Sequence, residues 1–404
     1  MTRGDNSGGG PRSDRGGNRS NVPVTKRELK IGLALSGGGV RAAVFHLGVL
    51  GRLAEEGLLE SVAFVSTVSG GSLGTGLIYT LAGNRWPASA EYLGSVMPEA
   101  RRLLTNVDIQ RDALFRLLLR PWRLVSRGWA NVLSESLVRR WGVSGLVSQL
   151  PRRPRWIINA TSYESGKNWR FAPHRMGDYL TGHVFEPPVP LADAMAASAG
   201  YPILIGFLVL KTKDYPWKRY LEGSTSETEP SEPGLRRLHL WDGGAYDNLG
   251  VEALFKPGRL REGCNFLVVS DASGALGPER RYRIYRQARR LLSIAMDQVR
   301  SLRSRMVFDH FLKHPGSGVY LMMGGTAQKI LREAGLSTQK IEEISTGCLP
   351  DEEVERVALF PTTLRKIGQA EFDRLYRHGW EVADCNLRAR RPDLFATVPT
   401  SRRQ

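Results

Sequence analysis

Two adjacent stretches decide the fold: KIGLALSGGGVRAAVFHLGVLGRLAEEGLL at 30–59 and VAFVSTVSGGSLGTGLIYTLAG at 62–83. Each begins with a short apolar run and continues through a turn of small residues. Each then ends in apolar residues at helical spacing, such as Val44, Leu47 and Leu50. Two successive strand–turn–helix units predict a parallel sheet covered by helices. We therefore expect an α/β fold.

The composition is that of a globular protein with a strongly basic charge balance. The chain has 404 residues, 41% hydrophobic and 24% charged, which is enough to bury a large core. Its 57 Lys and Arg against 40 Asp and Glu give a formal net charge of +17, which indicates an anionic partner. The basic residues are scattered and no nucleic-acid-binding module is recognisable, so we expect a membrane surface rather than a nucleic acid.

The sequence divides into three regions. Residues 1–29 are rich in Gly, Ser and Arg and are expected to form a disordered basic tail. Residues 30–385 form the predicted globular domain, with a basic and apolar insert at about 85–150 and a polar loop at 222–234. Residues 386–404 are expected to form a basic C-terminal tail.

Neither a targeting segment nor a metal site is expected. The N-terminal residues contain no apolar core of a signal peptide, and no run of about 18 apolar residues could cross a bilayer. The three cysteines lie far apart, which excludes a disulfide framework and a paired-cysteine metal site. We therefore expect a cytoplasmic protein that needs no metal or cofactor.

Ser69 is the candidate nucleophile. It follows an apolar run directly and precedes Gly70 and Gly71, the place where a strand-to-helix turn holds a serine hydroxyl exposed. Thr67 stands where the usual G-x-S-x-G pattern has its first glycine. Ser72 matches the letters of that pattern, but it should lie inside the first helical turn, so we favour Ser69.

Gly37, Gly38 and Gly39 form a candidate anion cradle. Consecutive glycines at a helix N-terminus let several backbone N–H groups point at one spot, either a phosphate or the oxyanion of acyl transfer. Ala42 stands where a dinucleotide-binding fingerprint needs glycine, and the chain lacks the phosphate-binding loop motif G-x-x-x-x-G-K-[ST]. Arg41 follows the cradle and carries the nearest positive charge.

Two strand-end aspartates are candidates for a general base. Asp242 follows the strand-like RLHLW and precedes Gly243 and Gly244, which predicts an exposed acid at a sharp turn. Asp271 follows the apolar FLVVS and is a competitor for the same role.

Taken together, these motifs resemble the patatin-like phospholipase family. The matching stretches, in family order, are SGGGVR at 36–41, STVSGGS at 66–72, AMAASAGYPILIGF at 194–207 and DGGAYDNLG at 242–250. LRKIGQAEFDRLYRHGWEVA near the C-terminus is similar to the closing helix of that family. The resemblance covers about residues 30 to 385 and implies a three-layer α/β fold with a mostly parallel central sheet flanked by helices.

The resemblance implies a lipid acyl hydrolase with a Ser–Asp dyad. Ser69 would attack an ester of a membrane phospholipid, and Asp242 would accept its proton. The N–H groups of residues 37–39 would hold the oxyanion, with Arg41 stabilising the loop or the developing charge. Two alternatives remain open: a serine esterase with a Ser/Asp/His triad, in which His378 is the best-placed histidine, and a non-catalytic protein that binds anionic surfaces.

Residues 101–141 are the candidate membrane-docking segment. They contain nine Arg and three acids, a local charge of +6, interleaved with Leu and Trp. Basic residues favour an anionic leaflet, and Leu and Trp suit the membrane interface. The alternative is a pair of amphipathic helices packed on the core with a solvated basic face.

Overall fold

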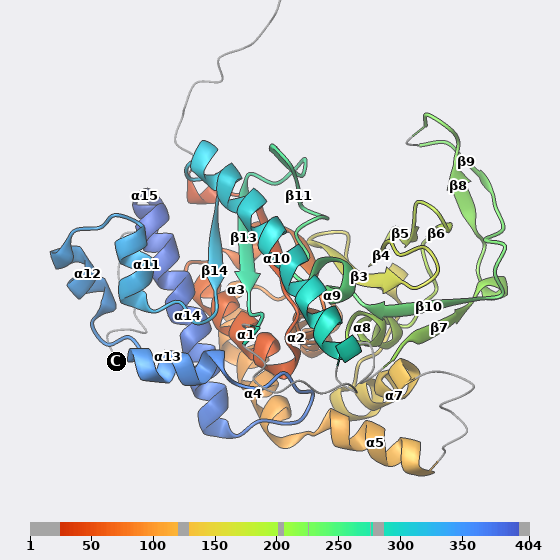
Figure 1. The fold of residues 1–404 in the computed structure, drawn as a ribbon, viewed down its shortest axis with the longest axis horizontal. Coiled ribbons are helices and arrows are strands. Elements are labelled where there is room, and N and C mark those ends of the chain that lie inside the picture. The colour runs from red at the N-terminus through yellow and green to blue at the C-terminus, as the bar shows by residue number, and fades with distance from the viewer. Residues whose placement is uncertain are drawn as a thin grey trace, which may run out of the picture.

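A computed structural model describes residues 25–119, 129–200, 206–224, 226–274, 276–277 and 287–395. The centre of the fold is a parallel sheet (Figure 1). Its five strands, in spatial order, are β14 (Gly318–Met322), β13 (Phe266–Asp271), β1 (Ile31–Leu35), β2 (Val62–Thr67) and β3 (Arg155–Ser162). The strands expected from the apolar runs after Lys30 and Ser61 are thus present.

Beyond β3 the sheet continues with antiparallel strands. The sequence analysis names one of them, the strand-like RLHLW at 237–241, but does not anticipate the antiparallel pairing. One path runs through β4 (Asn168–Ala172), β5 (Arg175–Asp178), β6 (Gly182–Phe185), β8 (Lys218–Tyr220) and β9 (Thr228–Pro230). The other path runs from β3 through β10 (Arg237–Asp242) to β7 (Leu208–Lys211). The predicted polar loop 222–234 contains β9. A separate hairpin pairs β11 (Phe255–Lys256) with β12 (Arg259–Leu260).

Helices cover both faces of the sheet, which confirms the predicted three layers (Figure 1). One layer contains α1 (Gly39–Glu55), α2 (Gly70–Leu81), α8 (Leu191–Ser198) and α14 (Gln369–Arg390). The other contains α9 (Gly244–Asp247) and α10 (Gln287–Lys313). Alternate strand residues divide between the two layers: Leu33 and Val268 join the core with α1, whereas Ala34 and Leu267 join the core with α10.

The predicted insert at 85–150 is largely helical. It contains α3 (Ser89–Glu91), a short π-helix (Tyr92–Val96), α4 (Met97–Asn106), α5 (Ile109–Leu119) and α7 (Trp129–Trp141). The C-terminal part adds α11 (Ala327–Glu333), α12 (Thr338–Ser345), α13 (Asp351–Ala358) and α15 (Pro392–Phe395). Residues 1–24 and 396–404 of the two predicted tails lie outside the described residues.

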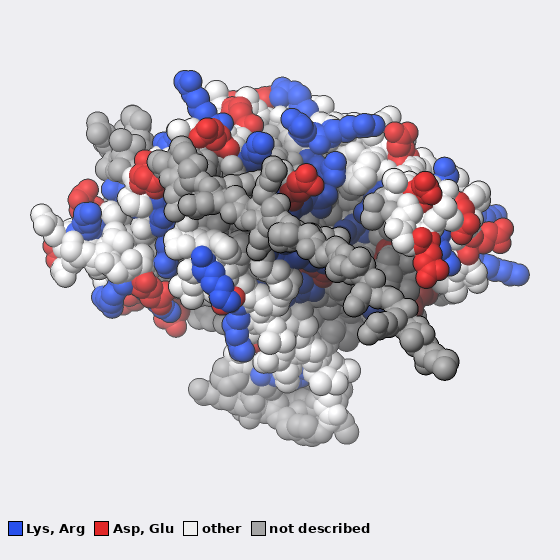
Figure 2. All heavy atoms as spheres, turned by 90° about the horizontal axis from the view of Figure 1, so that it is seen from above, with Lys and Arg blue, Asp and Glu red and all other residues white. Residues whose placement is uncertain are grey.

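The closing helix packs directly against the first helix. Gly48 of α1 and Gly379 of α14 allow this, because a Cβ at either position would lie about 2 Å from a backbone oxygen of the other helix, 1.9 Å from Tyr376 O and 2.0 Å from Phe45 O. Within the described residues, no helix is long and apolar enough to cross a membrane. On the face seen from above, Lys and Arg side chains gather over β11 and β4–β6 (Figure 2).

Candidate active site

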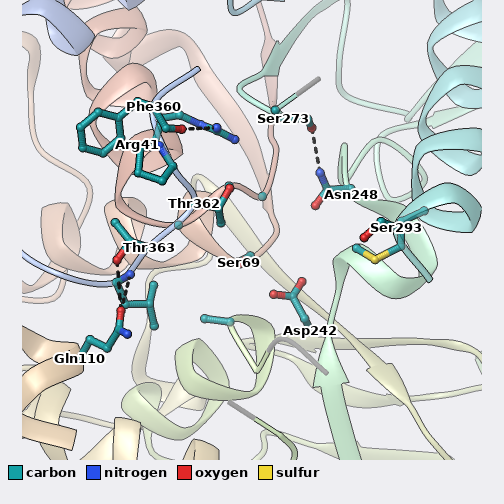
Figure 3. A pocket seen from close by; sticks show the side chains of 18 of the residues that line it. Arg41, Ser69, Gln110, Asp242, Asn248, Ser273, Ser293, Phe360, Thr362 and Thr363 are labelled. Carbon is teal, nitrogen blue, oxygen red and sulfur yellow. Dashed lines mark hydrogen bonds between the residues drawn. The ribbon is translucent and has the colours of Figure 1, made fainter. Parts of the chain in front are cut away.

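Three loops that the sequence analysis singles out meet in one cavity of about 680 Å³ (Figure 3). The predicted site residues that line it are Gly37, Gly38, Gly39, Arg41, Ser69 and Asp242. The other three predicted residues, Gly71, Gly243 and Gly244, do not line it, and a Cβ at each would lie 2.5 to 2.6 Å from a neighbouring oxygen. Ser69 comes from the end of β2, the glycine loop from the end of β1, and Asp242 from the end of β10.

Ser69 has the backbone of a nucleophile elbow. Its φ of 49° and ψ of −115° place a non-glycine residue in a strained conformation between β2 and α2. The turn is tight: a Cβ at Gly70 would lie 2.1 Å from the carbonyl oxygen of Gly39, and one at Gly71 would lie 2.5 Å from that of Leu35. The Ser69 N–H donates to the Ser198 Oγ at 3.0 Å, which anchors the turn to α8.

Ser72 is part of the support for this turn. Its fully buried hydroxyl lies 2.8 Å from the Thr67 Oγ1 and 2.7 Å from the Ser198 Oγ. The indole N–H of Trp156 donates to the same Thr67 oxygen at 2.9 Å. Thr67, which replaces the usual elbow glycine, therefore joins a hydrogen-bond network beneath Ser69. Ser72 does not line the cavity, whereas Ser69 does.

Asp242 is buried beside Ser69 with its carboxyl turned toward it (Figure 3). Its Oδ1 accepts a hydrogen bond from the Gly244 N–H at 2.7 Å, and the Ser69 hydroxyl is the other polar group that acts on this carboxyl. Burial raises the pKa of Asp242 to about 7, although the Gly244 N–H and the Ser69 hydroxyl both favour the charged form. A carboxyl that titrates near neutral pH is suited to accept a proton and to return it.

Asp271, the competing acid, has a different environment. Its Oδ2 lies 3.0 Å from the Arg300 Nη1 and accepts a hydrogen bond from the Tyr320 hydroxyl at 2.8 Å. Its Oδ1 accepts from the Ser273 N–H at 3.0 Å. Asp271 does not line the cavity. Its carboxylate therefore links the end of β13 to α10 and β14.

The glycine loop presents backbone N–H groups at the start of α1. Gly38 and Gly39 have φ of 146° and 65°, conformations that other residues rarely adopt. The Gly37 N–H donates to the carbonyl of Asn248 at 3.0 Å, and the Val40 N–H donates to the carbonyl of Thr363 at 2.8 Å. The N–H groups between them lie at a helix N-terminus, where no intrahelical carbonyl is available.

Arg41 fixes this loop from behind. Its buried guanidinium donates to the carbonyl of Phe360 at 2.6 Å and to that of Ala272 at 3.3 Å. Burial lowers the pKa of Arg41 to about 10, and the nearby Asp271 carboxylate opposes that effect. Arg41 therefore ties α1 to two loops that are distant in the sequence.

Two groups of cavity residues were missed by the sequence analysis. Asn248 donates from its Nδ2 to the Ser273 Oγ at 2.8 Å (Figure 3). It belongs to the quoted DGGAYDNLG stretch, so the motif itself could have indicated it. Residues 358–364 close one side of the cavity, where the Gln110 side chain accepts from the Thr363 hydroxyl at 3.1 Å. No sequence signal marks this contact between α5 and a distant loop.

No histidine is placed to complete a triad. All seven histidines lie in the described part of the chain, and none lines the cavity. His378, the best-placed candidate from the sequence, accepts a hydrogen bond from the Gly324 N–H at 3.0 Å and packs against Phe45. Burial lowers the pKa of His378 to about 4. It is a core residue of α14.

The remainder of the cavity wall is mostly apolar. Its apolar side chains from α5, α7, α10 and the loop after α13 are Ala113, Leu114, Leu117, Val132, Leu133, Met296, Leu359, Phe360, Pro361 and Leu364. A cavity that combines one polar corner with a long apolar wall fits a substrate that has a reactive polar group and a hydrocarbon chain.

Comparisons with known proteins give a family and a set of distant structures. The family model described as patatin-like phospholipase matches residues 33–255. The structure of human GIVD cytosolic phospholipase A2 is similar with 14% identity and a TM-score of 0.48, over 87% of this chain and 60% of that one. No curated protein matches the chain.

Two further structures of the same human enzyme, both in complex with methyl gamma-linolenyl fluorophosphonate, are also similar. With terbium chloride the identity is 15% and the TM-score 0.45, over 88% of this chain and 57% of that one. Without terbium chloride the identity is 16% and the TM-score 0.43, over 89% of this chain and 57% of that one. This chain therefore spans less than two thirds of the solved chains that it matches.

Proposed function

The chain belongs to the patatin-like phospholipase family, and on that premise we propose that it is a lipid acyl hydrolase acting on membrane phospholipids. The observation that carries the proposal is the pairing of a strained Ser69 with a buried Asp242 whose pKa is about 7. An aspartate with its ordinary pKa near 3.9 would be a poor base for a serine hydroxyl. The apolar surroundings of Asp242 remove that difficulty.

In the proposed mechanism the dyad works through an acyl-enzyme. The Ser69 Oγ attacks the ester carbonyl while the Asp242 carboxylate takes the hydroxyl proton. That proton then passes to the leaving alcohol oxygen as the ester bond breaks. In the second half, Asp242 takes a proton from water, the hydroxide attacks the acyl carbonyl, and the proton returns to Ser69 as the fatty acid leaves.

The oxyanion is assigned to the N–H groups of Gly38 and Gly39. Because the Gly37 N–H already donates to Asn248, Gly37 serves the loop rather than the oxyanion. Arg41 is a positioning residue, since its guanidinium donates to backbone carbonyls of two other loops. Donors fixed before the reaction stabilise the developing negative charge without rearrangement, and one such donor typically contributes about 3 kcal/mol.

The serine assignment is tested by lipid mass spectrometry on phospholipid liposomes. Wild-type protein should release fatty acid, and Ser69→Ala should release none above the background. Ser72→Ala is the matched control, since Ser72 lies three residues away but outside the cavity, and it should retain substantial activity. Full activity of the Ser69→Ala variant contradicts the assignment. So does a natively folded Ser72→Ala variant that releases no fatty acid although its Ser69 is still reactive.

We also propose that α5 docks the protein on an anionic membrane at its cytoplasmic face. Leu118 is 80% exposed and lies one turn from Leu114, which lines the cavity, and Phe115, the residue next to Leu114, is 60% exposed. The positive charge of this segment is partly neutralised, because Arg116 and Arg140 both pair with Asp112 at 2.7 Å. The local charge of +6 already includes Asp112, and the exposed Phe115 and Leu118 add apolar insertion to that electrostatic attraction.

Vesicle sedimentation tests this docking surface. Binding should be tighter to anionic than to zwitterionic vesicles and should fall with salt, since the Debye length shortens from about 10 Å at 0.1 M to about 3 Å at 1 M. Phe115→Ser with Leu118→Ser should remove the salt-resistant part and leave hydrolysis of a soluble ester intact. Leu312→Ser, a control on α10 at 77% exposure, should bind as wild type. Equal binding of the α5 variant contradicts the proposal.

A further inference from the structure

A second cavity, of about 430 Å³, lies on the antiparallel part of the sheet. It shares no lining residue with the candidate active site. Residues of β4, β5 and β6, together with Ile157 of β3, form its floor. Residues between 246 and 261 form its walls. The patatin-type chemistry proposed above uses none of these side chains.

The strand register leaves space at the floor of this cavity. Arg170 of β4 pairs with Gly177 of β5, and Gly177 pairs with His183 of β6, so the three positions lie in one row across the sheet. Gly177 has no side chain to fill the row, and a Cβ there would lie 2.1 Å from the carbonyl oxygen of Gly182. Gly177 therefore lines the cavity with its backbone alone, between the side chains of Arg170 and His183.

Positive charge dominates the lining. The cationic residues that line the cavity are Lys167, Arg170, Arg175, Lys256 and Arg261. The acidic ones are Asp178 and Glu252. Seen from above, this is the part of the surface where Lys and Arg gather over β11 and β4–β6 (Figure 2).

The two carboxylates neutralise only part of the charge of these five cations. Asp178 is used within its own turn, where its oxygens accept from the N–H groups of Leu180 and Thr181 and from the hydroxyl of Ser165. Glu252 is shared among three cations, Arg170 and Lys256 at 3.3 Å and Arg303 at 2.8 Å.

Two guanidiniums in particular have neutral partners. Arg175 donates to the Tyr220 hydroxyl at 2.5 Å, and Arg261 donates to the carbonyl of Ala253 at 3.0 Å. Within the described residues, neither forms an ion pair with a carboxylate. Both therefore have charge and donors available to an anion that enters the cavity.

The pKa values of neighbouring basic groups are lowered by the same excess of positive charge. Burial and the guanidiniums of Arg155, Arg175 and Arg261 together lower the pKa of His174 to about 4. The pKa of Arg261 is lowered by burial and by Arg155, Arg170 and Arg175. Several like charges held this close are unfavourable unless a negative group lies among them.

We propose that this cavity binds a phosphate-bearing anion of small-molecule size. Arginine presents paired N–H donors that match the geometry of phosphate oxygens, and three arginines line this cavity. Tyr179, Tyr220 and Tyr246 add aromatic walls and hydroxyl groups, which suits an organic phosphate ester better than a bare ion. A soluble phosphorylated metabolite and the head group of a phosphorylated lipid share this chemistry.

Titration calorimetry with inorganic pyrophosphate at 0.15 M salt tests the site. Wild-type protein should bind one equivalent with saturation. Arg175→Ala should weaken binding about tenfold to a hundredfold, the effect of losing one charge-assisted donor, and Arg175→Lys should lie between the two. Arg259→Ala is the matched control, because Arg259 is exposed on β12 and does not line the cavity. It should bind as wild type.

Two further arms separate the sources of the phosphate. One measures soluble inositol trisphosphate, and the other measures phosphatidylcholine vesicles that contain a phosphatidylinositol bisphosphate. Vesicle binding that depends on Arg175 supports a lipid head group, and soluble binding alone supports a metabolite. Absence of binding to all three probes overturns the proposal, and so does an equal loss in Arg259→Ala. Circular dichroism checks the fold of each variant, and failure of ester hydrolysis would leave this result unaffected.

Discussion

The ends of β10 and β13 carry two buried aspartates with opposite environments. Asp242 ends β10, accepts a hydrogen bond from the Gly244 N–H and faces Ser69, groups without a formal charge. Asp271 ends β13 and pairs with Arg300 while it accepts from the Tyr320 hydroxyl. The comparison teaches that burial alone does not make a base. Burial raises the pKa of Asp242 to about 7 beside these two neutral groups, whereas the Asp271 carboxylate forms an ion pair with Arg300.

The largest expected difference between the two strand ends is in hydrolysis. Asp242→Asn should reduce kcat on a soluble ester by about a thousandfold or more, because an amide cannot accept the serine proton. The folded fraction of the Asp271→Asn variant should retain most of the wild-type activity. Initial rates, normalised to folded protein, measure both. A dead, folded Asp271→Asn beside an active Asp242→Asn would reverse the assignment of the base.

Stability should change in opposite directions. The pKa of Asp242 is about 7 in the folded state and about 4 in the unfolded state. As pH rises, the Asp242 carboxyl therefore loses its proton in the unfolded chain before it does so in the folded protein. The wild-type fold is therefore penalised progressively between pH 4 and 7, by up to about 4 kcal/mol at 1.36 kcal/mol per pKa unit. Asp242→Asn, which cannot ionise, should be more stable than wild type at pH 8 and similar at pH 4.

Asp271→Asn should instead destabilise the fold by about 1–3 kcal/mol, since it weakens the contacts to Arg300 and Tyr320. Urea unfolding at pH 4 and pH 8 provides both free energies of unfolding. Destabilisation of Asp242→Asn at pH 8 would show that its carboxylate is compensated after all, and the contrast between the strand ends would be lost.

A smaller effect should follow from giving Asp242 a cation of its own. Met296 of α10 lines the active-site cavity, and its Cε would lie 3.1 Å from a Cβ at Gly244. Met296→Lys should therefore place an ammonium group near Asp242 and lower its pKa. The acidic limb of kcat/KM should shift to lower pH, with a several-fold lower plateau because the base is weaker. Met296→Leu is the control and should leave the pH profile in place.

The local part of this architecture could be predicted from the sequence. The strands β1 and β2 and the turns after them follow from apolar runs and small residues that are adjacent in the chain. The conformation of Ser69 follows from the same pattern, since the turn is a local feature. The prediction of a mostly parallel central sheet is confirmed for the five central strands.

What the sequence left open depends on contacts between distant residues. Asp242 and Asp271 look alike in the sequence, because the Arg300 that distinguishes them lies 29 residues beyond Asp271. Apart from the strand-like RLHLW of β10, the antiparallel strands were missed because they are short and partly polar, for example KRY in β8. The basic cavity is formed by alternate residues of three such strands, so no single motif marks it.

The most direct test of the account is the pH dependence of Ser69 labelling by a fluorophosphonate. The reaction needs the serine hydroxyl to be deprotonated by Asp242, and it avoids the later steps of turnover. The rate of labelling for the wild-type protein should rise with pH through a single ionisation near pH 7, and Asp242→Asn should lose both the rate and the ionisation. A wild-type rate that is flat between pH 5 and 9, or labelling on Ser72, would contradict the pairing of Ser69 with Asp242.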